Sequence, residues 1–216
     1  MNVVCKIASL FAQCAVSART KRNFKNMDIE FEATFIDIDL DIFRKKLKSV
    51  GAELINPERL MKRVVFDPPQ DMAGAWLRVR DEGDKITMSI KQVTGNKIDE
   101  QKETELIIDN FEEGVKFLES IGGKKKSYQE NKRESWLYRE AKIEIDTWPG
   151  LESFVEVEAK SEKMVKSISE DLGLDFSKGL FGSVEIVYKI KLGIPPKVIN
   201  DETPEITFEN PPLQYK

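Results

Sequence analysis

The sequence contains no histidine, and its two cysteines, Cys5 and Cys14, both lie near the N-terminus. Without histidine the chain cannot build a zinc site from histidine ligands, a Ser-His-Asp triad or a histidine general base. Without cysteine in the body of the chain there is no disulfide framework, which agrees with a cytoplasmic location. Any catalysis must therefore use carboxylates, Lys, Arg, Tyr or a metal ion held by oxygen ligands.

Long hydrophobic runs are also absent. No stretch approaches the roughly 20 apolar residues that a transmembrane helix needs, so we expect no membrane association. Residues 1–27 contain five of the 34 basic side chains and none of the 38 acidic ones. The rest of the chain therefore has 29 basic and 38 acidic side chains, a net charge of −9. An acidic body argues against a general nucleic-acid binder.

Three parts are expected along the chain. Residues 1–27 would be a disordered leader, a targeting segment or a misassigned start, because regular alternation begins directly after Met27. Residues 28–192 have the strand and helix patterns of one folded domain. Five of the nine prolines lie after Ile194, so residues 193–216 are expected to form an extended Pro-rich tail.

The stretch from Ile143 to Glu158 contains two short alternating runs, separated by Thr147-Trp148-Pro149-Gly150. Alternation with period two is typical of a β-strand, and Pro-Gly is a strong turn signal. We therefore expect a hairpin with Asp146, Glu156 and Glu158 on one face. For one hairpin alone, an acidic edge that faces solvent is the simpler explanation.

The same arrangement recurs elsewhere. Glu30 and Glu32 alternate with apolar residues, and so do Glu103 and Glu105. Each of the three acidic strands leads into an amphipathic helix that ends at a glycine. The expected helices are residues 39–50, 111–121 and 161–172, and the expected strands are residues 28–36, 62–66, 75–80, 85–91, 102–107, 129–138, the two arms of the hairpin and 183–190.

About eight strands with one charged and one apolar face, and few helices to cover them, favour one geometry. This geometry is a closed antiparallel eight-stranded β-barrel with about three flanking helices. The charged faces of the strands would line a polar lumen, and the helices would cover part of the apolar outer side. The predicted fold class is therefore α+β. Charged side chains that point inward are costly unless they are paired or bind a ligand. The inward set would be Glu30, Glu32, Arg78, Arg80, Lys91, Glu103, Glu105, Arg133, Asp146, Glu156 and Glu158.

Such a lumen would combine two kinds of chemical group. Clusters of carboxylate oxygens suit Mg²⁺ or Mn²⁺. Arg and Lys at fixed spacing suit phosphate oxygens, which Arg can grip through its two-pronged guanidinium. Together these groups predict a site for a metal-chelated polyphosphate. The alternative is an ordinary sheet with a salt-bridged, solvated face.

Several motifs follow one another between Asp28 and Lys191: Glu30-Phe31-Glu32, Leu77-Arg78-Val79-Arg80, the strand with Lys91, Lys102-Glu103-Thr104-Glu105, Arg133 before Trp136, and IDTWPGLESFVEVE. This ordered set resembles the CYTH superfamily, the triphosphate tunnel enzymes. That superfamily includes class IV adenylyl cyclases, thiamine triphosphatases and inorganic triphosphatases. The resemblance implies an eight-stranded antiparallel tunnel, spanning the expected domain of residues 28–192.

The resemblance also implies roles for single residues. Acidic residues of the tunnel would hold the metal or orient metal, water and basic groups, and basic residues would grip the triphosphate. The implied residues are Glu30, Glu32, Glu156 and Glu158 for the metal, Glu105 and Asp146 for catalysis, and Arg78, Arg80, Lys91, Glu103 and Arg133 for the substrate.

One position departs from the family pattern. The opening motif of the family is Glu-x-Glu-x-Lys, and this chain has Thr34 in place of the lysine. The family lysine contacts phosphate, so the lumen would have one positive charge fewer. Lys132 and Lys189 are the lysines that could fill the same space instead.

The expected function is metal-dependent cleavage of a triphosphate-containing substrate, with Mg²⁺ or Mn²⁺, by a phosphohydrolase. The substrate would be a nucleoside, thiamine or inorganic triphosphate. One alternative is a class IV adenylyl cyclase that makes cyclic AMP from ATP. An alternative of another class is a non-catalytic module that binds a polyphosphate or nucleotide, for which Thr34 is the best evidence. The expected partner is a small molecule rather than nucleic acid or membrane, and a homodimer is left open.

Overall fold

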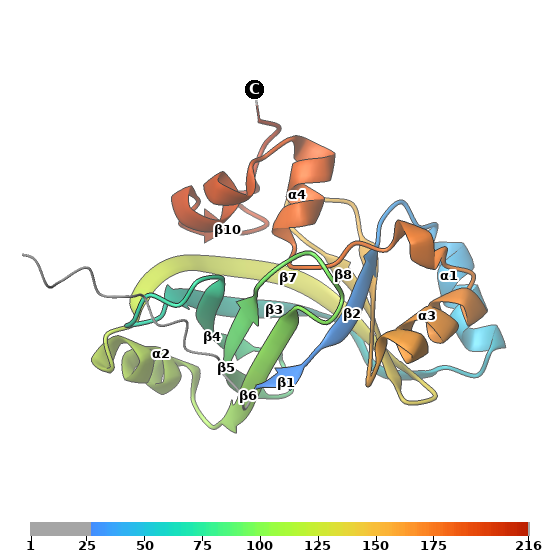
Figure 1. The fold of residues 1–216 in the computed structure, drawn as a ribbon, viewed down its shortest axis with the longest axis horizontal. Coiled ribbons are helices and arrows are strands. Elements are labelled where there is room, and N and C mark those ends of the chain that lie inside the picture. Colours follow the sequence, from blue (N-terminus) through green and yellow to red (C-terminus); the bar gives the residue numbers. More distant parts are fainter. Residues whose placement is uncertain (1–26, 216) are drawn as a thin grey trace, which may run out of the picture.

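The computed structural model of the protein describes residues 27–215, so the expected leader lies almost entirely outside the described residues. These residues form ten strands and four α-helices, and runs of consecutive strands are separated by single helices up to β9 (Figure 1). The strands are β1 (Asp28–Ile29), β2 (Phe31–Phe35), β3 (Glu53–Asp67), β4 (Ala75–Asp81), β5 (Ile86–Val93), β6 (Gln101–Ile108), β7 (Lys124–Tyr138), β8 (Ala141–Thr147), β9 (Phe154–Ala159) and β10 (Glu205–Ile206).

Nine of these strands form a nearly closed antiparallel barrel, which confirms the predicted fold class. Their order is β1-β6-β5-β4-β3-β7-β8-β9-β2. The first and last members are almost continuous in sequence, because only Glu30 separates β1 from β2. β1 pairs with β6 and β2 pairs with β9, so the segment 28–35 joins the two edges of the sheet. Counted as one interrupted strand, this segment gives the barrel the eight strands that were expected.

The three predicted helices lie outside the barrel. In Figure 1, α1 and α3 lie together at one end of the molecule and α2 lies toward the other end. Leu47 of α1 and Ile168 of α3 join Val155 of β9 in one apolar cluster, and Leu118 of α2 packs in a second cluster with Val79 of β4. None of the helices within residues 27–215 is long and apolar enough to span a membrane. The helices are α1 (Leu40–Ser49), α2 (Phe111–Ser120), α3 (Glu162–Asp171) and α4 (Glu185–Leu192).

The fourth helix replaces a predicted strand. Residues 183–190 were expected to be extended, and this prediction is wrong because α4 begins at Glu185. The sequence SVEIVYKIKL has apolar residues at period two and also at spacings of three and four, so the pattern fits either element. Packing decides between them, because Val187 and Tyr188 of the helix are buried in one cluster with Trp148 of the hairpin turn.

The C-terminal tail is also more structured than expected. An extended tail was predicted for residues 193–216, but Val198–Glu202 forms a π-helical turn and β10 forms a parallel strand beside β7. The N–H of Val198 donates to the carbonyl oxygen of Pro195 at 2.9 Å. Proline is tolerated in a first helical turn because its missing N–H is not needed there, so Pro195 can begin the turn. Figure 1 shows this segment and α4 together on one side of the barrel.

The packing of α4 gives a stability prediction. Tyr188 is fully buried and its hydroxyl donates to the carbonyl oxygen of Pro149 at 2.8 Å. Tyr188→Ala should lower the free energy of unfolding by about 3–5 kcal/mol, because it leaves a large cavity. Tyr188→Phe keeps the ring and should cost only about 1 kcal/mol, the value of one hydrogen bond. Urea denaturation of the two variants measures both costs, and an equally small loss in both would show that α4 does not pack tightly on the barrel.

Candidate active site

The barrel encloses a cavity of about 1120 Å³. Its lining contains every residue that was expected to point inward, so alternation along the strands identified the lumen face correctly. The outward neighbours of these residues are apolar: Ala33 and Phe35 of β2, for example, belong to the core between the barrel and α1 and α3. The expected residues that line the cavity are Glu30, Glu32, Arg78, Arg80, Lys91, Glu103, Glu105, Arg133, Asp146, Glu156 and Glu158.

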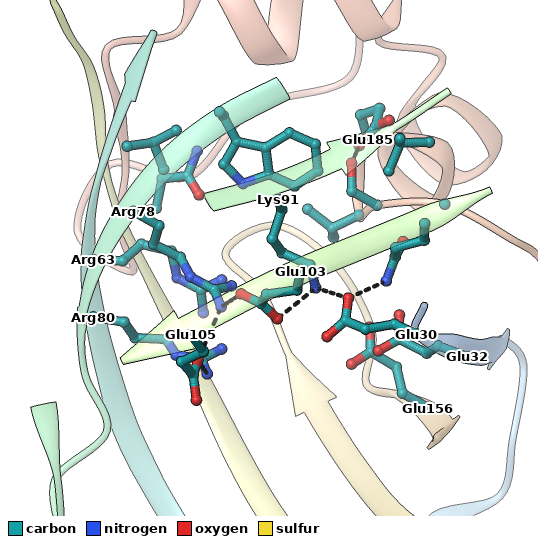
Figure 2. Close-up of a pocket in the computed structure, with 18 of the residues that line it drawn as sticks. Glu30, Glu32, Arg63, Arg78, Arg80, Lys91, Glu103, Glu105, Glu156 and Glu185 are labelled. Carbon is teal, nitrogen blue, oxygen red and sulfur yellow. Dashed lines mark hydrogen bonds and ion pairs between the residues drawn. The ribbon is translucent and has the colours of Figure 1, made fainter. Parts of the chain in front are cut away.

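Charges of opposite sign are unevenly distributed within the cavity (Figure 2). Three arginines from β3 and β4 gather on one side, and Glu30, between β1 and β2, lies with glutamates of β2 and β9 on another. Lys91 and Glu103, from β5 and β6, lie between the two groups. We call the first group, Arg63, Arg78 and Arg80, the basic side, and the second group, Glu30, Glu32, Glu156 and Glu158, the acidic side.

Lys91 connects the two sides. Its ammonium lies 2.7 Å from Glu30 and 3.5 Å from Glu103, and Glu103 in turn accepts a hydrogen bond from Arg78 at 2.8 Å. Burial alone would lower the pKa of Lys91, but the neighbouring carboxylates outweigh it and raise that pKa to about 12. Burial would raise the pKa of Glu103, but Lys91 and Arg78 outweigh it and hold that pKa far below its usual range. Glu103 and Lys91 are therefore both charged at neutral pH.

Glu105 was predicted to be catalytic and lies beside the basic side. One of its oxygens is 3.3 Å from Arg80 and 3.6 Å from Arg78, and the other is 3.8 Å from Lys85. Arg80 also donates to the buried carboxylate of Glu82 at 2.6 Å. Glu105 is thus placed to orient these cations, and its carboxylate stays partly exposed to the cavity.

Arg133 of β7 gathers three carboxylates. Two of its N–H groups donate to the two oxygens of Asp146, each at 2.6 Å, and one of them also donates to Glu156 at 2.8 Å. Glu144 lies 3.8 Å away. Burial would lower the pKa of Arg133, but these carboxylates outweigh it and raise that pKa well above its ordinary value. Asp146, which was predicted to be catalytic, and Arg133, which was predicted to bind the substrate, hold each other in place through a two-pronged ion pair.

The acidic side has more carboxylate than cation. Burial raises the pKa of Glu30 to about 7, although Lys91 partly offsets the effect. Burial also raises the pKa of Glu32, with a further contribution from Glu158. Burial, and then the charges of Glu32 and other carboxylates, raise the pKa of Glu156 well above its usual value. Each of these buried carboxylates makes it harder for the others to be charged. An added cation would relieve this repulsion and should therefore bind strongly.

The donor chemistry of the acidic side fits Mg²⁺ or Mn²⁺, which prefer oxygen ligands. The four glutamates of the acidic side are not arranged as a complete metal site, because no group of three or more acidic side chains within residues 27–215 converges at metal-binding geometry. Ion pairs explain this, since Lys91 holds Glu30 and Lys142 lies 3.0 Å from Glu158. A cation would have to draw these carboxylates away from their ammonium partners.

Neither Lys132 nor Lys189 takes the place of the motif lysine that Thr34 replaces. Thr34 lies opposite Glu156 in the pairing of β2 with β9, so its side chain is on the lumen face, yet it is buried and does not line the cavity. Lys132 faces outward, with its ammonium 5.4 Å from the ring centroid of Phe208. Lys189 is exposed on α4. The hypothesis that either lysine fills the space is therefore wrong.

The sequence interpretation missed several lining residues, and two of them are central. Glu144 precedes Asp146 by two positions, so the alternation already placed it on the same face. Arg63 lies in a predicted strand whose neighbours Val64 and Phe66 are apolar, and the pairing of β3 with β4 sets it opposite Arg80. Alternation could have identified both residues. Glu185 also lines the cavity, but it lies on α4, where a strand was expected.

The raised pKa of Glu30 gives a pH prediction. Without divalent cations, the free energy of unfolding should fall as the pH rises from 4.5 through about 7. A carboxyl group with a higher pKa in the folded state stabilises that state below the unfolded pKa, and the stabilisation is lost as the pH passes the folded pKa. Glu32, Glu103 and Lys91 face Glu30; the pKa of Glu32 is also raised, whereas Glu103 and Lys91 titrate outside this range.

Urea denaturation in EDTA at several pH values measures this slope. Glu30→Gln should reduce it, because glutamine has no proton to lose, and excess Mg²⁺ should reduce it in the unaltered protein. A slope that is the same in both proteins would contradict the burial of an uncompensated carboxyl group at this position.

Comparison with known proteins agrees with this architecture. The sequence profile of the CYTH domain matches residues 28–178, most of the chain, and the protein belongs to the CYTH domain family. A search of curated protein sequences gives no match to the chain. Residues beyond 178, which include α4 and the lining residue Glu185, lie outside the matched range.

Solved structures share the fold at low sequence identity. A candidate adenylate cyclase from Vibrio parahaemolyticus is 16% identical with a TM-score of 0.64, over 76% of this chain and 99% of that one. A conserved hypothetical protein from Pyrococcus furiosus is 23% identical with a TM-score of 0.57, over 69% and 94%. A candidate adenylyl cyclase from Hippeastrum, described as having a dominant triphosphatase activity, is 15% identical with a TM-score of 0.50, over 79% and 99%.

Proposed function

We propose that the protein binds a triphosphate-containing molecule together with a divalent cation inside the barrel and cleaves it as a phosphohydrolase. The observation that supports this most directly is the uneven distribution of charge in one cavity. Arg63, Arg78 and Arg80 gather on the basic side, and the acidic side has buried carboxylates with raised pKa values that Lys91 and Arg133 offset only in part. A polyanion bound to a metal ion is the kind of ligand that satisfies both sides at once.

In this proposal the acidic side holds Mg²⁺ or Mn²⁺, through Glu30, Glu32, Glu156 and Glu158. The cation would neutralise charge that develops on the phosphoryl oxygens. On the other side, Arg78 and Arg80 would bind phosphate oxygens through N–H groups that their carboxylate partners leave free. Lys91 lies between the two sides and would contact phosphate once Glu30 turns toward the cation.

The remaining predicted residues would act by positioning. Both oxygens of Asp146 accept hydrogen bonds from Arg133, so Asp146 would orient Arg133 rather than contact water itself. Glu103 would fix Lys91 and Arg78. Glu105 is the most exposed of these carboxylates to the cavity and would position the attacking water.

An adenylyl cyclase is the second candidate. The cavity extends beyond the arginines to Trp76 and to Asn200 of the C-terminal segment, so it has room for a nucleoside as well as three phosphates. A cyclase would present the ribose hydroxyl to the α-phosphorus and release pyrophosphate. A hydrolase would direct water at the terminal phosphorus and release inorganic phosphate.

Product analysis separates these functions. The protein should be incubated with ATP, thiamine triphosphate or inorganic triphosphate, each with Mg²⁺, with Mn²⁺ or with EDTA. We expect inorganic phosphate from at least one substrate when a cation is present, and none in EDTA. Cyclic AMP and pyrophosphate from ATP would establish the cyclase, and tight binding without any product would establish a binding module. Undiminished cleavage in EDTA would contradict the role of the acidic side.

A further inference from the structure

Arg63 differs from the other arginines of the lumen because it has no acidic partner in the part of the chain that the structure describes. It lies on β3, lines the cavity and is only 6% exposed. Arg78 pairs with Glu103, and Arg133 pairs with Asp146 and Glu156. Among residues 27–215, no carboxylate lies within ion-pair distance of the Arg63 guanidinium.

Neutral groups hold the Arg63 side chain in place. One terminal N–H donates to Oδ1 of Asn131, and the guanidinium carbon lies 4.5 Å from the centroid of the Trp148 ring. Asn131 is fully buried and Trp148 is nearly so, which fixes both partners. The Nε of Arg63 is buried and has no acceptor within the described residues. The guanidinium is thus oriented without being neutralised, and one of its buried donor atoms has no partner among the described residues.

The surroundings of Arg63 are electropositive. Burial lowers its pKa, and the charges of Arg78, Arg80 and Arg133 lower it further. In the pairing of β3, Arg63 lies opposite Arg80 on one neighbouring strand and opposite Gln129 on the other. A buried cation beside other cations destabilises the ligand-free protein. An anion at this position would reverse that effect and accept a hydrogen bond from Nε.

We propose that Arg63 is a further substrate-binding residue, which donates its Nε hydrogen bond to a phosphate oxygen of the bound triphosphate. It thereby supplies the positive charge that Thr34 does not provide. The inference rests on the proposed function, because it takes a triphosphate as the ligand of the cavity. The anion that contacts Arg63 also lies against Arg78 and Arg80, so the three arginines bind one chain of phosphates.

Two measurements on Arg63→Gln test this inference: the dissociation constant of inorganic triphosphate with Mg²⁺, by titration calorimetry, and the melting temperature without ligand. Triphosphate affinity should fall about 10- to 100-fold, the effect of losing a hydrogen bond to a charged group. The ligand-free melting temperature should rise, because an unpaired buried charge is removed. Arg63→Lys keeps the charge without the planar guanidinium, so its affinity should lie between those of Arg63→Gln and the unaltered protein.

Arg44→Gln is the matched control. Arg44 is an arginine outside the cavity, and it donates to both oxygens of the buried carboxylate of Glu134. Its replacement should lower the melting temperature and leave triphosphate affinity unchanged. A purely structural role for Arg63 predicts the same pattern for Arg63→Gln, and that result would overturn the inference, as would unchanged triphosphate affinity.

A separate cleavage assay distinguishes the two proposals. Unaltered protein that binds triphosphate but never cleaves it would contradict the hydrolase and leave the role of Arg63 intact. Cleavage by the unaltered protein, together with undiminished affinity in Arg63→Gln, would contradict only the role of Arg63. Failure of the unaltered protein to bind triphosphate would overturn both.

Discussion

Replacing Glu30 and Glu156 together by glutamine is expected to abolish cation-supported cleavage of triphosphate. The two carboxylates lie on the acidic side, and burial raises the pKa of each. Glutamine keeps the shape and a carbonyl oxygen but removes the negative charge that attracts the cation. The fold should survive, because Lys91 retains Glu103 and Arg133 retains Asp146 as partners.

Cleavage assays over a range of Mg²⁺ and Mn²⁺ concentrations measure this effect. Glu140→Gln is the control, since Glu140 pairs with Lys160 on the exposed surface and should not matter for cleavage. The double variant should be inactive at every cation concentration and should melt no lower than the unaltered protein. Full activity in the double variant would show that the cation, if one is needed, binds elsewhere.

Arg133→Ala is expected to lower the free energy of unfolding by about 3–5 kcal/mol, the cost of leaving buried charges without their partner. Arg133 contacts Asp146 and Glu156 directly and lies near Glu144, and Asp146 is only 1% exposed. Removing the guanidinium leaves three carboxylates together in a buried region. They can then lower the cost only by taking up protons.

Denaturation at several pH values tests this explanation. The loss in Arg133→Ala should be greatest at high pH and should shrink as the pH falls and the carboxylates become protonated. Arg139→Ala removes another arginine of the chain, whose own side chain is 55% exposed in its pair with Asp171, so it should cost only about 0–1 kcal/mol. An equally small loss in Arg133→Ala would show that the three carboxylates tolerate one another without a cation.

Much of the lumen could be predicted because strand alternation is a local property. In a strand, neighbouring side chains point to opposite faces. The apolar partners of Glu30 and Glu32 therefore had to face a core, and one charged face on nearly every strand favoured a closed barrel. The cavity lined by all the expected residues follows from that rule alone.

The rest depends on contacts between distant segments. The segment 183–190 has a pattern that suits both a strand and a helix, and packing on the hairpin turn selects the helix. Ion pairing within the lumen cannot be read from the sequence either. Within the described residues Arg133 faces three carboxylates and Arg63 faces none.

The most direct test of the account is a crystal structure with Mn²⁺ and a non-hydrolysable triphosphate analogue. Anomalous scattering locates the metal independently of the phosphates. We predict Mn²⁺ on the acidic side, bound by carboxylates that include Glu30 and Glu156, and phosphate oxygens in contact with Arg63, Arg78 and Arg80. An empty cavity at saturating concentrations of both ligands, or phosphates bound outside the barrel, would contradict the account.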